Sequence, residues 1–235
     1  DSGAVFKLRQ ARIGVGSTTA SVDNSGAAIQ VLGTPVKQVY FTSYDDETLG
    51  VDTNPVPTTP SSGNWGGITI QQDVDRGQGR FRYDKEGIFL NYINQADIKY
   101  GGGTVVVNSN LQVVNPIDIV GARPTVTFNT ISNNASAAIA ADPNSFEETN
   151  FNAPPFQVSG SFTADYSRVG PDISRNRLVN NSNNGLFVRI KTLAGGTLVP
   201  MTVSGRFDDT DVVHILSQNL IIQGTPPGPR LLRVA

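Results

Sequence analysis

Apolar residues in this chain are grouped in short runs that favour β-strands over helices. The N-terminal run has neither the spacing of a helical stripe nor a perfect strand alternation, and we interpret it as two short strands with apolar positions at Val5, Leu8, Ala11, Ile13 and Val15. The runs AAIQVLG and KQVYFTS are rich in β-branched and aromatic residues, and Gly33-Thr34-Pro35 lies between them. These two runs are predicted to form a strand, a turn and a second strand.

Three polar segments interrupt the apolar runs and are predicted to be long loops. Residues 44–64 hold Pro55, Pro57 and Pro60, which block both a helix and a strand ladder. Charged residues fill 73–85, and residues 141–169 look like an insertion. Between the second and third loops, residues 87–115 contain at least three strand candidates. We expect a single domain over 1–235 from which the loops project sideways, where a partner would be recognised.

An internal repeat is the most informative feature of the pattern. The segment PTVTFNTISNNASAAI, which begins at Pro124, can be laid without a gap on PDISRNRLVNNSNNGLF, which begins 47 residues later at Pro171. Apolar positions and Asn positions recur together, and the unit is a strand, an Asn turn and a second strand. Self-similarity of this kind is typical of solenoids, in which each coil buries its apolar face against its neighbours.

The repeated Asn residues have two physical uses in a solenoid. Asn tolerates the left-handed backbone conformation at tight bends, and its amide can hydrogen-bond to the Asn of the next coil. The sequence therefore predicts an all-β fold, a right-handed parallel β-helix with long lateral loops. A two-sheet β-sandwich is the alternative, and the Asn-centred repeat disfavours it.

Five segments carry a resemblance to known proteins: VLGTPVKQVYFTSYDDETLG, SSGNWGGITI, INQADIKYGGG, the Asn-rich repeats and FDDTDVVHIL, in this order. In that order they resemble the large right-handed parallel β-helix proteins of bacteria, planctomycetes especially, that are described as surface-exposed. The resemblance covers nearly the whole chain, but its motifs are packing motifs. It implies a β-helix of stacked coils and an extracellular or cell-surface location.

Composition and charge narrow the classes of function. Hydrophobic residues make up 38% of the chain and charged residues 16%, while 24 Gly and 14 Pro suit many turns. The net charge of -2 is spread without blocks, so we expect neither nucleic acid nor an anionic membrane as partner. No apolar run is long enough to span a bilayer, and the absence of Cys excludes disulfides and thiol catalysis. The start Asp1-Ser2-Gly3 lacks an initiator Met and a signal pattern, which suggests an excised piece.

Two acidic groups are candidate calcium sites, and calcium is the one cofactor that the pattern suggests. The first lies in the loop 44–64, where Glu47 accompanies the candidate ligands Asp45, Asp46, Asp52 and Asn54. Such hard oxygen ligands on a flexible segment are what calcium requires. In proteins that resemble this chain, the same loop often looks like a DxNxDG calcium loop, whereas here Val56 and Pro57 replace its last acidic residue and Gly. A solvated acidic loop is the interpretation we favour there.

The second candidate calcium site comprises Asp208, Asp209 and Asp211. Formation of turns by Asp side chains is the competing role for this group.

Catalytic constellations are incomplete. His214 is the sole His, and without a second recognisable member of a triad or metal site we interpret it as a structural, hydrogen-bonded residue. The pairs Asp45-Asp46 and Asp208-Asp209 could supply the carboxylates of a glycosidase, and Arg189 or Lys191 the basic residue of a lyase, but no pattern places them together. Trp65, between Asn64 and two Gly, is interpreted as a residue packed at a coil corner.

These observations favour a non-catalytic structural or adhesive module, one that associates end to end because open β-helix ends expose unpaired backbone groups. The expected partners are further β-helix coils or like subunits, and polysaccharide or cell-surface matrix. The alternative is a polysaccharide lyase or glycoside hydrolase of the pectate-lyase-like β-helix class. That alternative requires carboxylates and a basic residue to converge on one face.

Overall fold

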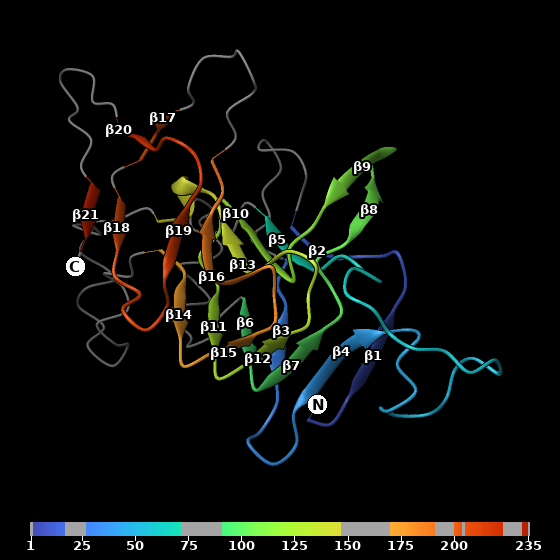
Figure 1. Ribbon diagram of the computed structural model, residues 1–235. Helices are drawn as coiled ribbons and strands as arrows, with labels where there is room; N and C mark the ends of the chain where they lie inside the picture. The colour runs from blue at the N-terminus through green and yellow to red at the C-terminus, as the bar shows by residue number, and fades with distance from the viewer. Residues whose placement is uncertain are drawn as a thin grey trace.

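A computed structural model describes residues 2–16, 27–71, 91–146, 170–190, 200–203, 205–222 and 232–234. The fold is all-β, and nearly all of its strands pair in parallel (Figure 1). Within the described ranges the helical content is one short 3-10 turn, η2 (Pro143–Phe146), and there is no α-helix. The predicted fold class is therefore confirmed at the level of an all-β protein built from parallel sheets.

Three parallel sheets form the body of the protein. Sheet A has the order β1 (Val5–Leu8), β4 (Val39–Ser43), β7 (Ala96–Lys99), β12 (Thr130–Ser132) and β15 (Arg177–Val179). Sheet B has the order β2 (Ile13–Val15), β5 (Ile68–Gln71), β10 (Ile117–Val120), β13 (Ala137–Ala141), β16 (Asn183–Val188) and β19 (His214–Leu216). Sheet C has the order β3 (Gln30–Leu32), β6 (Tyr92–Asn94), β11 (Thr125–Thr127) and β14 (Asp172–Ser174).

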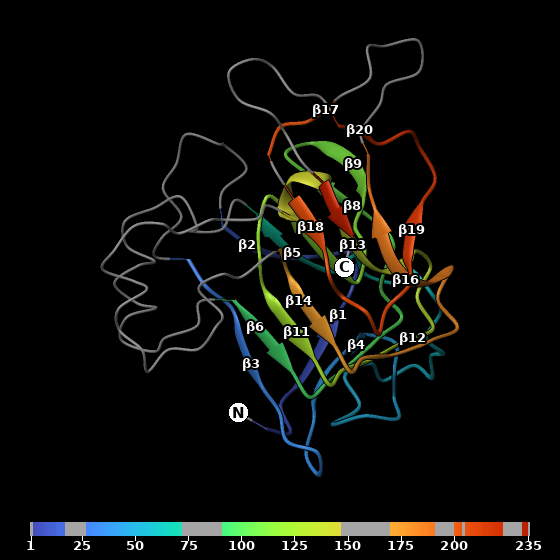
Figure 2. The ribbon, with the colours of Figure 1, turned by 90° about the vertical axis from the view of Figure 1, so that its left-hand side faces the viewer.

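The chain visits the three sheets in a fixed cyclic order. From β1 it passes to sheet B, then to sheet C, and then returns to sheet A at β4, where it pairs in parallel with β1. The rounds that begin at β4, β7 and β12 repeat this path and lay their strands beside those of the round before, and β15 and β16 begin a further round. Figure 1 shows the successive rounds side by side, and Figure 2, turned by 90°, shows the strands of sheet C beside one another in the order β3, β6, β11 and β14.

Smaller elements are attached to these sheets. The strands β8 (Thr104–Val107) and β9 (Asn110–Val113) form an antiparallel hairpin that extends away from the three sheets (Figure 1). Near the C-terminus, β17 (Pro200–Met201) pairs in parallel with β20 (Ile221–Ile222). In the same way β18 (Gly205–Phe207) pairs with β21 (Leu232–Val234).

Paired strands are aligned so that apolar side chains of one strand lie next to apolar side chains of the neighbouring strand in the interior. In sheet B one row, read from strand to strand, is Ile13, Ile68, Ile117, Ile139, Leu186 and His214. The matching row of sheet C is Val31, Ile93, Val126 and Ile173, and that of sheet A is Phe6, Phe41, Ile98, Ile131 and Leu178. Most of these side chains are fully buried. A slip of one residue would turn an entire row outward, so burial of the rows fixes the register.

The Asn residues of the repeat form two ladders at the corners of the coils. Asn129 Oδ1 accepts from the backbone N of Ala96 at 2.9 Å, and Asn176 Oδ1 accepts from that of Asn129 at 3.0 Å. At the next corner, Asn134 and Asn181 make the same contacts to Gly101 and Asn134. The two repeats therefore align at the predicted offset of 47 residues, and the predicted contact between Asn side chains of successive coils is present.

At each corner, the residue just before the Asn of the ladder adopts the left-handed backbone conformation. At the corner from sheet C to sheet A it is adopted by Gln95, Phe128 and Arg175, with φ of 54°, 58° and 56°. At the corner from sheet A to sheet B, Asn133 and Asn180 adopt it. The ladder Asn residues thus satisfy the backbone, while neighbouring residues of several types make the bend.

The loop 44–64, expected to project sideways, contains no strand or helix and is tied to the rest of the protein by hydrogen bonds at two points. Its Val51 carbonyl accepts a hydrogen bond from Lys7 Nζ at 2.7 Å, and its Ser62 hydroxyl donates to the Asn133 carbonyl at 2.9 Å. The predicted loop 73–85 lies outside the described residues. Within 141–169, Ala141 still belongs to β13, η2 follows, and residues 147–169 lie outside the described part of the chain.

Candidate functional site

Polar side chains gather in the segment 208–214, beside the last described strands of sheets B and C. Asp209 Oδ1 accepts a hydrogen bond from the backbone N of Ile173 at 2.9 Å, and Asp211 Oδ2 accepts one from that of Arg175. Asp208 forms an ion pair with Arg206 at 2.9 Å, and both side chains are partly exposed. The three carboxylates of Asp208, Asp209 and Asp211 therefore contact different partners, on and beside β14 and β18.

The Asp209 carboxylate faces His214. Asp209 Oδ2 lies 4.0 Å from His214 Nε2, and their side chains are only 7% and 19% exposed. Neither atom has a hydrogen-bond partner among the described residues. Burial, with smaller contributions from the like charges of Asp208, Asp172 and Asp211, raises the pKa of Asp209 to about 7.

His214 is largely a packing residue, as its sequence context predicts. It ends the interior row of sheet B, and its ring stacks on Phe207 with centroids 5.2 Å apart. Burial lowers the pKa of His214 below its ordinary value, so the ring is neutral at physiological pH. The expectation of a hydrogen-bonded histidine is not met at Nε2 within the described residues.

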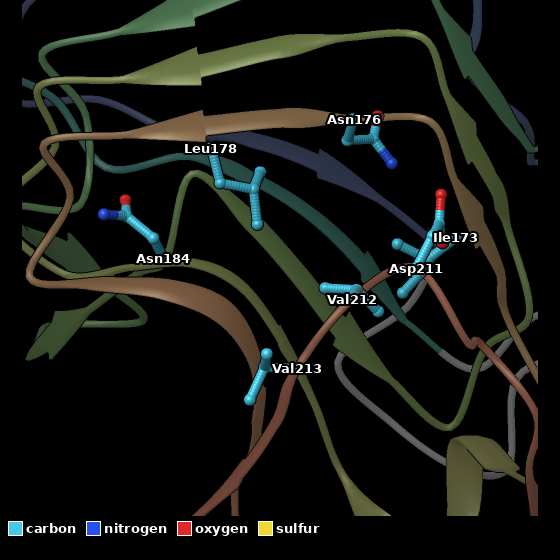
Figure 3. Close-up of a pocket in the computed structure, with 7 residues that line it drawn as sticks. All are labelled: Ile173, Asn176, Leu178, Asn184, Asp211, Val212 and Val213. Atoms are coloured by element: carbon cyan, nitrogen blue, oxygen red, sulfur yellow. The ribbon is translucent and has the colours of Figure 1, made fainter.

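A half-open pocket of about 210 Å³ lies beside this segment (Figure 3). Its apolar lining is Ile173, Leu178, Val212 and Val213, and its polar lining is Asn176, Asn184 and Asp211. Ile173 and Leu178 are the last members of the interior rows of sheets C and A. Among the described residues, the pocket therefore lies at the end of these two rows.

The first candidate calcium group lies on the outer side of sheet A. Asp46 is fully buried and accepts hydrogen bonds from the hydroxyls of Thr42 and Thr48, with Lys99 Nζ at 3.3 Å. Burial alone would raise the pKa of Asp46, but these hydrogen bonds and the Lys99 ammonium together lower it below its ordinary value. Asp46 therefore serves as a charged anchor that holds the loop to β4 and β7.

Two other acidic residues of this loop, Glu47 and Asp52, and the amide of Asn54 also accept hydrogen bonds from within it. Glu47 accepts from the backbone N of Thr58, Asp52 from that of Asn54 at 2.9 Å, and Asn54 from that of Val56 at 3.2 Å. The contacts of Asp52 and Asn54 are the short-range turn contacts that Asp and Asn side chains commonly make. Among the described residues, no three acidic or His side chains come together in a way that could hold a metal ion.

The groups considered for polysaccharide cleavage lie in separate places. Arg189, which directly follows β16, lies between the buried Val188 and Ile190, and its own side chain is 19% exposed. Its guanidinium reaches back along sheet B to form an ion pair with Asp118 of β10. Asp45-Asp46 belong to the loop over sheet A, and Asp208-Asp209 lie at the end of sheet C. Lys191 is outside the described residues.

Sequence reasoning missed the pair Asp118–Arg189, whose partners are far apart in the chain. The available signal was an acidic residue inside the apolar strand IDIV, where a charge is retained only with a partner.

Trp65 behaves as its neighbours predict. It is fully buried, its indole Nε1 donates to the Lys99 carbonyl at 2.9 Å, and Gly101 packs closely against the ring.

Comparisons with other proteins add no assignment to this geometry. In the described residues, no helix has the length and apolar character needed to cross a membrane. Comparison of the chain with protein-family models, with curated proteins and with solved structures gave no significant match.

Proposed function

We propose that this chain is a segment of a right-handed parallel β-helix that acts as a non-catalytic structural or adhesive module of an extracellular or cell-surface protein. The observation that carries the proposal is the fixed cyclic order of the three sheets, with each round paired in parallel to the one before. A right-handed sense is assigned because crossover connections between parallel strands are right-handed in about 98% of cases.

The use of the polar residues supports a scaffold rather than an enzyme. Asp46 anchors a loop, Asp209 and Asp211 accept backbone N–H groups, and Asp118 is neutralised by Arg189. A glycosidase needs two carboxylates roughly 5–10 Å apart across an accessible bond, and a lyase needs a free basic group beside its metal. The carboxylates named here are already committed to the fold.

The surface loops and outer sheet faces are the surfaces that remain for a partner. Polysaccharide or a cell-surface matrix is the partner class that we propose, in keeping with the resemblance to surface-exposed β-helix proteins. Stacked coils give a stiff support whose length depends on the number of coils and not on the chemistry of any one loop.

A panel of neutral and acidic polysaccharides tests this function with two readouts on the same samples. Co-sedimentation with the insoluble polymers measures binding, and release of reducing or unsaturated ends measures cleavage. We expect binding of at least one polymer and no release of ends. Cleavage that disappears in both Asp118→Asn and Arg189→Lys would overturn the proposal and establish a lyase or hydrolase on sheet B.

A further inference from the structure

The edge of sheet C at β14 presents backbone donors to the side where the next strand would lie. In the earlier coils the corresponding donors meet backbone carbonyls: Gln95 N donates to the Thr127 carbonyl at 3.3 Å, and Phe128 N donates to that of Ser174 at 3.2 Å. Arg175 is the next member of this series. Its N–H donates instead to a side chain, the carboxylate of Asp211.

Asp209 acts in the same way two residues earlier. In a parallel ladder, alternate residues of a strand turn their N–H groups to the same neighbour, so Ile173 and Arg175 share an outward side. The carboxylates that accept from them, Asp209 and Asp211, are likewise two residues apart. The segment 209–211 thus takes the register of another parallel strand but supplies side-chain oxygens in place of carbonyls.

One of the Asn ladders also ends on a side chain that takes the place of a group from the next coil. Asn181 Oδ1 accepts from both the backbone N and the Nδ2 of Asn134, at 3.3 and 2.6 Å. Asn184 Oδ1 then accepts from the backbone N and the Nδ2 of Asn181, at 3.1 and 2.9 Å. Asn184 belongs to the same coil as Asn181, so the ladder closes without a further coil (Figure 3 shows Asn184 and Asp211 beside the last strands).

The opposite end of the same sheet is different. Within the described part of the chain, β3 pairs with β6 and has no strand on its other side. A second copy of the chain could therefore offer its β3 edge to β14, head to tail, if the outward N–H groups of β14 were free. Edge strands with free backbone groups are the usual route to such addition.

We propose that Asp209 and Asp211 form an end cap that closes this end of sheet C to the β3 edge of a second copy, while Asn184 closes the Asn ladder at the corner from sheet A to sheet B. The inference rests on the β-helix arrangement of the proposed function and reverses one of its expectations. End-to-end association of like subunits is blocked at this end by side chains that occupy the place of the next strand.

The test compares two double variants and a charge control. Asp209→Ala with Asp211→Ala removes the acceptors, whereas Asp209→Asn with Asp211→Asn removes the charge but keeps an acceptor oxygen at each position. Asp45→Ala with Asp52→Ala removes the same charge from the loop over sheet A. Sedimentation velocity over a range of concentrations and negative-stain micrographs report association, and amide hydrogen exchange reports the N–H groups of Ile173 and Arg175.

We expect the alanine pair to accelerate exchange of these two amides by roughly tenfold or more, because an N–H group that loses its acceptor is no longer protected. The same variant should sediment faster as its concentration rises and form end-to-end rods, while the asparagine pair and the charge control should behave as the original protein. Slow exchange in the alanine pair would overturn the cap. So would a folded alanine pair that exchanges rapidly without associating, or association in the asparagine pair as well.

Interior amides such as those of sheet B serve as the check on folding in every variant. The assay contains no polysaccharide, so its outcome is independent of whether the chain binds or cleaves one. Failure of the cap and failure of the proposed function are therefore distinguishable.

Discussion

Replacement of Asp209 by Asn should remove most of a pH dependence that this carboxylate gives to the folded state. The carboxyl group has a pKa of about 7 in the folded protein against an ordinary value of 3.8. The folded state therefore binds the Asp209 proton more tightly than the unfolded chain does between these two values. The free energy of unfolding should fall as pH rises through this interval and level off above about pH 7.

The size of the effect follows from the shift in pKa. Each pKa unit corresponds to about 1.4 kcal/mol, so the full interval is worth about 4 kcal/mol and the part between pH 5 and pH 7 about 2–3 kcal/mol, as upper limits. The amide introduced by Asp209→Asn could not ionise, its oxygen would still accept from Ile173, and its nitrogen would face His214 Nε2. We expect this variant to match the original protein at pH 5 and to exceed its stability by about 2 kcal/mol at pH 8.

Urea unfolding at several pH values, followed by fluorescence of the single buried Trp65, measures this difference. Burial also raises the pKa of Asp97, and the lowered pKa of His214 acts in the opposite direction below pH 6.5, so the comparison must be between variant and original protein at each pH. Asp45→Asn is the matched control, because that carboxylate lies in the loop over sheet A and is not among the groups that raise the pKa of Asp209. Parallel stability curves for Asp209→Asn and the original protein would refute the reasoning.

Three further predictions concern stability and metal binding. Ile131→Ala should cost about 2–5 kcal/mol of unfolding free energy, because Ile131 is fully buried between Ile98 and Leu178 in its row, whereas Val106→Ala on the exposed face of the hairpin should change it by less than about 0.5 kcal/mol in the same urea assay. Gly67→Ala should lower the thermal unfolding temperature far more than Gly121→Ala. A Cβ at Gly67 would meet the Asn115 carbonyl oxygen at 1.7 Å, whereas a Cβ at Gly121 would have open space, so that only its φ of +58° would cost stability, by about 1 kcal/mol. Calcium or a chelator should leave the unfolding temperature unchanged, since the Asp46 and Asp52 side chains of the loop accept hydrogen bonds within the protein; a calcium-dependent rise would restore the loop as a metal site.

The sequence predicted the repeated part of the fold in detail. Both members of the repeat are strand, corner and strand units, and Ile131 pairs with Leu178 as their alignment requires. This worked because each coil repeats the same local pattern, so the pattern of apolar and Asn positions is a direct record of strand register. The hairpin at Thr104–Val113 was foreseen only as strand candidates. Its turn at Asn108-Ser109 uses positive φ without a Gly, so the usual hairpin signature is missing.

The candidate site was less accessible to sequence reasoning. Asp209 and Asp211 were recognised as a cluster, but their use as acceptors for Ile173 and Arg175 depends on which strand lies beside them. The pairing of Arg189 with Asp118 likewise depends on the order of strands in sheet B. Local patterns predict which residues can act, whereas the partners of these residues are set by contacts between distant parts of the chain.

The direction of the Asn contacts has a consequence for how the protein is made. Asn129 donates from Nδ2 to the Ile93 carbonyl, and Asn176 donates to that of Val126, so each Asn bonds to the coil that precedes it in the chain. A coil therefore has its corner groups satisfied only after the next coil has been synthesised. During synthesis from the N-terminus, the most recently made coil lacks these hydrogen bonds until the next coil has been made. A chain that ends between coils would leave buried donors, such as the backbone N of Ala96, without an acceptor.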